Sequence, residues 1–251
     1  MQDWTGRHGT AAKGLEVSEE TLLNDNTSLI YRGLRELILT GHVPAGSHLS
    51  QVQLAVQYGV SRGPVREALR MLQRDGLIEA ELNRRVRVAA ISFEDLEQLY
   101  ALRIVTESLA LRAGVDRFTA VDLASMERAL EEMDVLAGGD IELWEKPHRQ
   151  FHQGLISYGG DRILRQCEQW FEHSERYRRI YFGADRRIND WREGARQHRE
   201  IFESCAERQA QIAAQLLARH LARTALSVLT LLSPEYEPGL LRAAVRAVTG
   251  T

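Results

Sequence analysis

Residues 61–72, Ser-Arg-Gly-Pro-Val-Arg-Glu-Ala-Leu-Arg-Met-Leu, are the stretch that decides the fold. They carry the signals of a helix of about three turns. Ser61 belongs to the residue types that cap a helix N-terminus, and Pro64 falls in the first turn, where its missing N–H costs little. Gly76 follows where a helix would stop. We therefore predict a helix that begins after Ser61 and ends before Gly76.

Two faces of this helix differ in chemistry. The apolar face carries Val65, Leu69 and Leu72. The other face carries three arginines at four-residue spacing, Arg62, Arg66 and Arg70. A guanidinium group offers paired donors that match guanine O6 and N7, so such a stripe fits the major groove of DNA. The alternative interpretation is a solvated face on an ordinary amphipathic helix, which is the commoner meaning of such spacing.

The flanking segments predict a winged helix-turn-helix. Residues 50–58 indicate a short capped helix, Gly59 and Val60 make the turn, and residues 28–40 place apolar side chains at helical spacing upstream. Downstream, a wing is predicted from two short strands, residues 77–80 and 86–88. The wing carries three arginines suited to phosphate or minor-groove contact, Arg84, Arg85 and Arg87.

The charge of this segment favours the DNA interpretation. Residues 26–91 contain nine Arg against five Asp plus Glu, a surplus of +4, whereas the whole chain has a formal charge of -3. A positive module within a negative protein implies a local polyanionic partner.

The run from Gly59 to Leu69, followed by Gly76-Leu77-Ile78, resembles the winged-helix signature of the GntR family of bacterial transcription regulators. This resemblance implies that Arg62 and Arg66 contact operator DNA. Arg85 stands where the family commonly has glycine, which predicts a more cationic wing. The full set of expected DNA-binding residues is Ser61, Arg62, Gly63, Pro64, Arg66, Arg70, Arg84, Arg85 and Arg87.

The length and composition of the chain predict two domains in a globular protein of ordinary composition. The chain has 251 residues, of which 44% are hydrophobic and 27% charged. It contains no run of eighteen apolar residues and no basic-then-apolar leader, so we expect a cytoplasmic protein without a membrane span. The two cysteines, Cys167 and Cys205, are interpreted as small buried hydrophobes.

The predicted fold class is mostly α. A flexible tail (1–25) precedes the winged helix-turn-helix domain (26–91), which has three helices and a β-hairpin wing. An all-helical bundle of about six helices follows (92–232), and residues 233–251 are expected to form a tail or a short helix. The bundle helices are predicted at 92–114, 119–138, 141–157, 161–182, 190–206 and 208–232.

Half of the eight histidines occur at suggestive positions in this bundle. His148 and His152 lie four residues apart on one predicted helix, and His198 and His220 lie on two later helices. Imidazole suits zinc, nickel, copper or iron, and a bundle core can draw ligands from several helices. For any one of them, a surface or hydrogen-bonded core histidine is the alternative interpretation.

The order of these histidines, with residues 103–107 upstream and 159–164 after the first pair, is similar to the FCD domain, the effector domain of the FadR subfamily. The resemblance implies a metal site of one aspartate and three histidines. His148 stands at the position of the aspartate, and His152, His198 and His220 fall on the three histidines.

Four neutral imidazoles would favour a nitrogen-preferring divalent transition metal, zinc or nickel above all, over magnesium or calcium. The resulting positive site is expected to bind a small organic acid. Arg103 is a candidate for pairing with that acid. An ion pair with Glu107, four residues on, is an equally weighted alternative.

The predicted function is a ligand-responsive transcription regulator, a repressor that binds operator DNA as a homodimer and senses a small organic acid through a metal site. A repressor that senses metal alone uses the same residues and remains an alternative. A metalloenzyme acting on a small acid is a weaker one, because the His148-x-x-x-His152 helix lacks the glutamate of zinc peptidases. We therefore expect no enzymatic activity.

Overall fold

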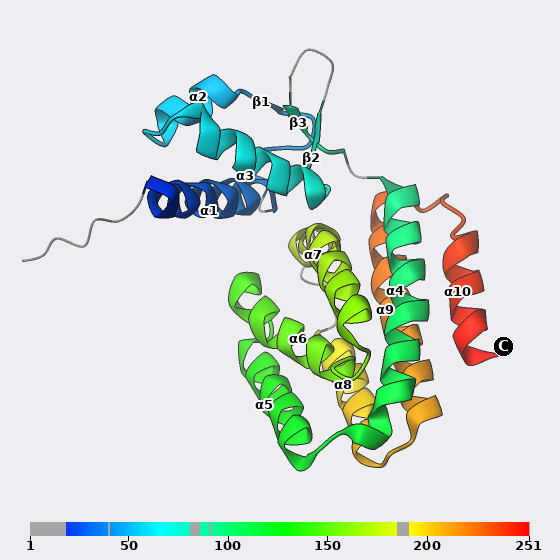
Figure 1. Ribbon diagram of the computed structural model, residues 1–251. Helices are drawn as coiled ribbons and strands as arrows, with labels where there is room; N and C mark the ends of the chain where they lie inside the picture. Colours follow the sequence, from blue (N-terminus) through cyan, green and yellow to red (C-terminus); the bar gives the residue numbers. More distant parts are fainter. Residues whose placement is uncertain (1–18, 40, 81–85, 91, 185–190, 251) are drawn as a thin grey trace, which may run out of the picture.

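The computed structural model describes residues 19–39, 41–80, 86–90, 92–184 and 191–250. A small N-terminal domain of helices and a sheet is joined to a larger helical domain where the chain passes from β3 to α4 (Figure 1). The described helices include none that is long and apolar enough to cross a membrane.

The N-terminal domain is the predicted winged helix-turn-helix. Its elements are α1 (Glu19–Leu39), β1 (His48–Leu49), α2 (Gln51–Gln57), α3 (Arg62–Arg74), β2 (Ile78–Ala80) and β3 (Val86–Val88). Gly59 makes the turn between α2 and α3 with a φ of 64°, which glycine adopts without strain. The apolar face of α3 packs against α1, and Ile30, Val65 and Leu72 are fully buried between them.

Two details of this domain differ from expectation. First, α1 begins at Glu19 instead of Ser28, within the segment expected to be a flexible tail. The polar run before Ser28 favours a cap in isolation, but the helix continues through it, with Thr27 and Ile30 buried. Second, the wing is a three-stranded antiparallel sheet in the order β1-β3-β2, with Leu49 opposite Val86. A two-residue strand is too short to show alternation in a sequence.

The larger domain is the predicted helical bundle with one helix more. Its elements are α4 (Phe93–Gly114), a 3-10 turn (Val115–Arg117), α5 (Ala120–Leu136), α6 (Ile141–Leu155), α7 (Asp161–Ala184), α8 (Trp191–Ala206), α9 (Ala210–Leu232) and α10 (Gly239–Thr249). Two of these helices, α4 and α5, begin where the sequence signals predicted. The Ser92 hydroxyl accepts from the Asp95 N–H at 3.0 Å, and Thr119 and Asp122 form a complete capping box.

The end of the described chain forms a helix, α10, not a tail. It packs against α4 and α9, and its residues Leu241 and Ala244 are buried. Glu97 of α4 holds the segment in place, because its carboxylate accepts from the Tyr236 hydroxyl at 2.7 Å and from the Leu241 N–H at 3.0 Å.

The helix α7 connects the two domains through hydrogen bonds to main-chain carbonyls. Arg176 donates to the carbonyl oxygen of Gly76, just after α3, at 3.0 Å. It also donates to the carbonyl oxygens of Ala89 and Ala90, at 3.0 and 2.9 Å. One guanidinium group therefore holds both the end of α3 and the segment that leads out of the wing.

Ion pairs between α7 and α1 add a second connection. Glu175, almost fully buried, pairs with Arg35, and Arg179 donates to Glu36 at 3.0 Å. Such charge-assisted bonds fix geometry more strongly than neutral ones, so α7 sets the position of the N-terminal domain.

Candidate metal centre and DNA-binding surface

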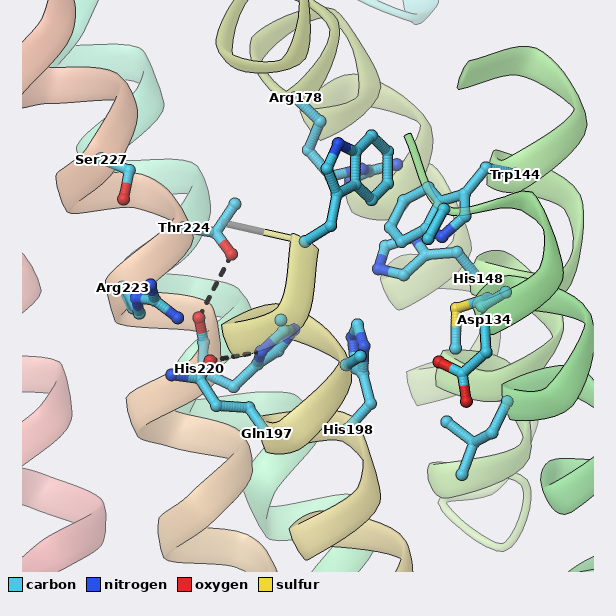
Figure 2. A pocket seen from close by; sticks show the side chains of 16 residues that line it. Asp134, Trp144, His148, Arg178, Gln197, His198, His220, Arg223, Thr224 and Ser227 are labelled. Carbon is cyan, nitrogen blue, oxygen red and sulfur yellow. Dashed lines mark hydrogen bonds between the residues drawn. The ribbon is translucent and has the colours of Figure 1, made fainter. Parts of the chain in front are cut away.

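Four histidines from three helices meet inside the larger domain. His148 and His152 lie one turn apart on α6, His198 lies on α8 and His220 on α9. Each offers a ring nitrogen within 4.8 Å of the others, and none is more than 7% exposed. Figure 2 shows His148, His198 and His220 around one space. The structure thus brings together the four histidines that the sequence singled out.

The ring nitrogens of this cluster fit a metal ion. Within the described residues, Nδ1 of His148, both ring nitrogens of His152 and Nε2 of His198 are buried without a hydrogen bond. Buried polar atoms almost always have a partner, so these nitrogens call for a ligand. Metal–nitrogen bonds of about 2.0–2.1 Å place the nitrogens of a tetrahedral site about 3.4 Å apart. The four ring nitrogens all lie within 4.8 Å of one another, so small side-chain shifts would let them reach one ion.

His220 is held in one tautomer by a chain of hydrogen bonds. Its Nδ1 lies 3.0 Å from Oε1 of Gln197, and Nε2 of Gln197 donates to Glu193 at 2.8 Å. Because a carboxylate only accepts, the Gln197 amide must present its oxygen to the imidazole. Nδ1 of His220 therefore carries the proton, and Nε2 is left free to bind a metal.

Replacing Gln197 by leucine is expected to weaken metal affinity by about 10–100-fold, because His220 would lose the acceptor that fixes its tautomer and ring orientation. Competition with a chromophoric chelator measures the change. Gln150→Leu, at an exposed glutamine of α6, is the matched control. Equal affinities for the two variants would show that Gln197 does not orient a metal ligand.

Burial keeps the four imidazoles neutral. Desolvation lowers the pKa of His198 to about 4. Desolvation, with nearby Arg178 as the next cause, lowers the pKa of His148 well below 6.5, and desolvation is also the main cause for His152 and His220. Neutral imidazole is the form that binds metal, so the site needs no proton release from these rings.

The metal-free protein is expected to lose stability as the pH falls below about 6.5, the pKa of histidine in an unfolded chain. A histidine whose folded pKa is depressed binds its proton only in the unfolded state, so acid favours unfolding. Each such histidine contributes up to about 1.4 kcal/mol per pH unit below that point. Urea unfolding of the chelator-treated protein at a series of pH values measures the slope, and a free energy of unfolding that does not change would contradict the expectation.

A small cavity of about 80 Å³ opens beside His148, His198 and His220. Two indoles line it, and the Trp144 ring stacks on the His148 ring with 4.3 Å between centroids. The wall also includes the cationic residues Arg178 and Arg223. The cavity therefore combines aromatic surface with positive charge.

Arg178 is a site residue that sequence reasoning missed. It is 3% exposed and donates from Nε and Nη2 to the two carboxylate oxygens of Glu145, both at 2.9 Å. Glu145 Oε2 in turn lies 3.6 Å from Nδ1 of His148, too far for a hydrogen bond. In the sequence, Arg178 belongs to a run with Arg176 and Arg179 that is typical of a solvated helix face.

Arg103 makes the internal ion pair that was one of its two predicted roles. Its Nε donates to Glu107 at 2.6 Å and its Nη1 donates to Ser174 at 2.9 Å, in a region where both charged groups are buried. Glu107 also lines a second cavity, of about 300 Å³, which reaches the cluster from the side of His152. Arg103 itself lines neither cavity among the described residues, so an effector contact from it remains a prediction.

The arginines of α3 form an exposed stripe. Arg62, Arg66 and Arg70 all face solvent, whereas Val65 and Leu69 face the domain core. Arg70 pairs with Glu67 at 3.3 Å, and both side chains are more than half exposed. An exposed pair of this kind contributes little, so it leaves Arg70 available to another anion.

The remaining predicted DNA contacts differ in their surroundings. Ser61 stands at the N-cap position but its exposed hydroxyl makes no cap hydrogen bond, contrary to our expectation, whereas Gly63 is half-buried in the first turn. Pro64 is buried in the first turn, where its ring helps to start the helix, and a DNA contact from it remains a prediction. Arg87 of the wing is 40% exposed and pairs with Glu79 at 3.1 Å. Arg84 and Arg85 lie outside the described residues.

Comparisons with known proteins match both domains to known families. Residues 26–88 match the model of bacterial regulatory proteins of the gntR family, and residues 98–223 match the FCD domain. The chain is 31% identical over 199 residues to the HTH-type transcriptional regulator BphR of Paraburkholderia xenovorans, covering 76% of this chain and 80% of that protein. It is 26% identical over 199 residues to the HTH-type transcriptional repressor GlaR of Escherichia coli, covering 76% and 90%.

Solved structures agree on the fold. McbR/YncC of E. coli superposes with a TM-score of 0.68 at 20% identity, over 82% of this chain and 98% of that one. The matched families and relatives are transcription regulators, not enzymes. The chain belongs to the GntR family of bacterial transcription regulators, with an FCD domain behind its winged helix-turn-helix.

Proposed function

We propose that this regulator is a dimeric repressor of the FadR subfamily whose affinity for operator DNA depends on a metal-bound small organic acid. The observation that carries the proposal is the cluster of four buried histidines, four of whose eight ring nitrogens are buried without a hydrogen bond among the described residues. His148, His152, His198 and His220 would hold zinc or nickel, since four imidazoles without a carboxylate suit these metals better than magnesium or calcium.

The chemistry of the cavity supports an acid as the effector. A dication held by neutral ligands keeps its full positive charge, and Arg178 and Arg223 add to it. The bound metal would act as a Lewis acid that accepts a carboxylate oxygen. The volume of about 80 Å³ corresponds to roughly three waters of liquid, so the described cavity suits a short acid.

An exposed apolar row on α4 supports a homodimer. Leu102, Val105 and Leu109 lie on one helix face and are 50%, 42% and 59% exposed. A dimer would cover this row and present two α3 helices to half-sites about one helical turn apart. Val105→Asp is expected to shift the protein toward monomer in sedimentation velocity. Val135→Asp, at a valine of α5 that is 85% exposed, is the matched control and should leave the mass unchanged.

The helix α7 offers a physical link between effector and DNA. Arg178 faces the metal cavity, whereas Arg176 and Glu175, on the same two turns, hold the N-terminal domain. A ligand that draws Arg178 away from Glu145 would move α7 and, with it, the winged helix-turn-helix domains of both protomers. A coupling of about 1–3 kcal/mol is typical of such switches.

The direct test is a gel shift of the regulator's own promoter fragment with metal, with chelator and with a panel of small organic acids. The proposal expects the affinity to change about 5–150-fold when metal and the right acid are both present. A response to metal alone would favour the second candidate, a repressor that senses only metal. Unchanged affinity under all conditions would remove the sensor function and leave DNA binding intact.

A further inference from the structure

A third and larger hollow lies between α9 and α10, and none of the four clustered histidines lines it. Its volume is about 960 Å³, and its floor includes Leu226, Leu241 and Val245. Four arginines line it: Arg219, Arg223, Arg242 and Arg246. The sequences of α9 and α10 contain no aspartate or glutamate, so these two helices do not balance the charge themselves.

Two of the four guanidinium groups already have acidic partners. Arg223 pairs with Glu193 at 3.3 Å, and Arg242 pairs with Glu237 at 2.8 Å. Within the part of the chain that the structure describes, Arg219 and Arg246 make no ion pair, and Arg219 is exposed. The groove therefore presents two available cations above an apolar floor.

We propose that this groove binds an anionic amphiphile. Its apolar body would lie on Leu226, Leu241 and Val245, and its carboxylate, sulfonate or phosphate would accept hydrogen bonds from Arg219 and Arg246. The volume lies near the upper end of the range for small-molecule sites. A purely apolar ligand would leave the arginines unused, and a nucleic acid backbone would leave the leucine floor without a partner.

The groove shares a wall with the metal cavity, because Arg223 and Ser227 of α9 line both (Figure 2). From Arg223, contacts run to Glu193 at 3.3 Å, on to Gln197 at 2.8 Å and then to His220 at 3.0 Å. An anion held by Arg219, one turn before Arg223 on α9, would draw Arg223 from Glu193 and so loosen the group that orients His220. Amphiphile and metal would then change each other's affinity by the same factor. This coupling rests on the proposed metal site, whereas binding in the groove does not.

Calorimetry of the metal-free full chain with decanoate, below the concentration at which it forms micelles, tests the site. We expect one decanoate to bind per chain. The uncharged decanol and the cationic decylammonium should each bind about tenfold or more weakly than decanoate. Replacing both Arg219 and Arg246 by alanine should weaken decanoate by about tenfold or more. The matched double variant, Arg128→Ala with Arg165→Ala, removes two exposed arginines elsewhere and should bind as the native chain does.

A second variant guards against loss of structure. Leu226 is 40% exposed, so Leu226→Glu should fold normally by circular dichroism yet repel decanoate from the floor. His152→Ala should keep decanoate binding, which separates this site from the metal centre. The proposal is overturned if decanoate does not bind, or binds the arginine double variant unchanged. It is also overturned if that variant dissociates the dimer in sedimentation velocity, which would make the groove an interface between copies.

Discussion

Replacing Arg66 by alanine is expected to weaken specific binding to operator DNA by about 30-fold or more. Arg66 lies in the middle of the exposed face of α3, and no ion pair within the described residues holds its guanidinium group. A bidentate contact with guanine contributes about 1–3 kcal/mol, and a dimer loses two of them. Fluorescence anisotropy at one fixed salt concentration, with operator and random duplexes in parallel, measures the loss.

Two variants make this result specific. Arg128→Ala removes an exposed arginine of α5, far from the predicted DNA-binding face, and should leave operator affinity unchanged. Arg66→Lys keeps the charge but not the fork, so it should retain binding to random duplex while losing preference for the operator. If Arg66→Ala weakens operator and random DNA equally, the residue contacts phosphate and does not read bases.

Replacing His152 by alanine is expected to abolish the metal-dependent response while sparing DNA binding. Both ring nitrogens of His152 are buried without a hydrogen bond in the described structure, so its removal leaves no protein group without a partner. Mutation of a residue that only orients a metal ligand typically lowers metal affinity by about 10–100-fold. Loss of one of the four ligands themselves should lower it further. The native protein at a free metal concentration of about 100 times Kd should gain about 2.7 kcal/mol of stability, and the variant should gain none.

Elemental analysis after dialysis and the shift in Tm on adding zinc or nickel measure these changes. His42→Ala, at an exposed loop position, is the control for removal of a histidine outside the cluster. Equal metal content in His152→Ala and the native chain would exclude His152 as a ligand. A native protein that never takes up metal would show that the four histidines are buried core residues and not metal ligands.

The sequence predictions succeeded where an element is fixed by residues close together in the chain, and failed where it depends on contacts between distant residues. The α3 helix could be predicted because its cap position, apolar face and glycine stop all lie within fifteen consecutive residues or so. The start of α1 could not, because the polar residues before Ser28 resemble a cap, whereas the fold carries the helix through them, with Thr27 and Ile30 buried. Strand β1 was missed because its two residues are too few to show alternation, and they become a strand by pairing with β3.

The same division runs through the candidate site. The four histidines could be selected from their order and from resemblance to a known domain, but Arg178 could not be told from its arginine neighbours. Only packing decides that Arg178 points inward to Glu145 while Arg176 points outward to the end of α3. Arg103 was left with two roles, and the buried ion pair with Glu107 is the one that the fold forms.

By itself, the amino-acid sequence determined that this protein has a cationic winged helix-turn-helix and a histidine-bearing helical domain, because periodicity, caps and charge are properties of neighbouring residues. Only the tertiary structure decided which nitrogens of the histidines are left without partners, which arginines line a cavity and how α7 joins the two domains. Those features depend on side chains far apart in the chain, and their environment exists only after the helices have packed.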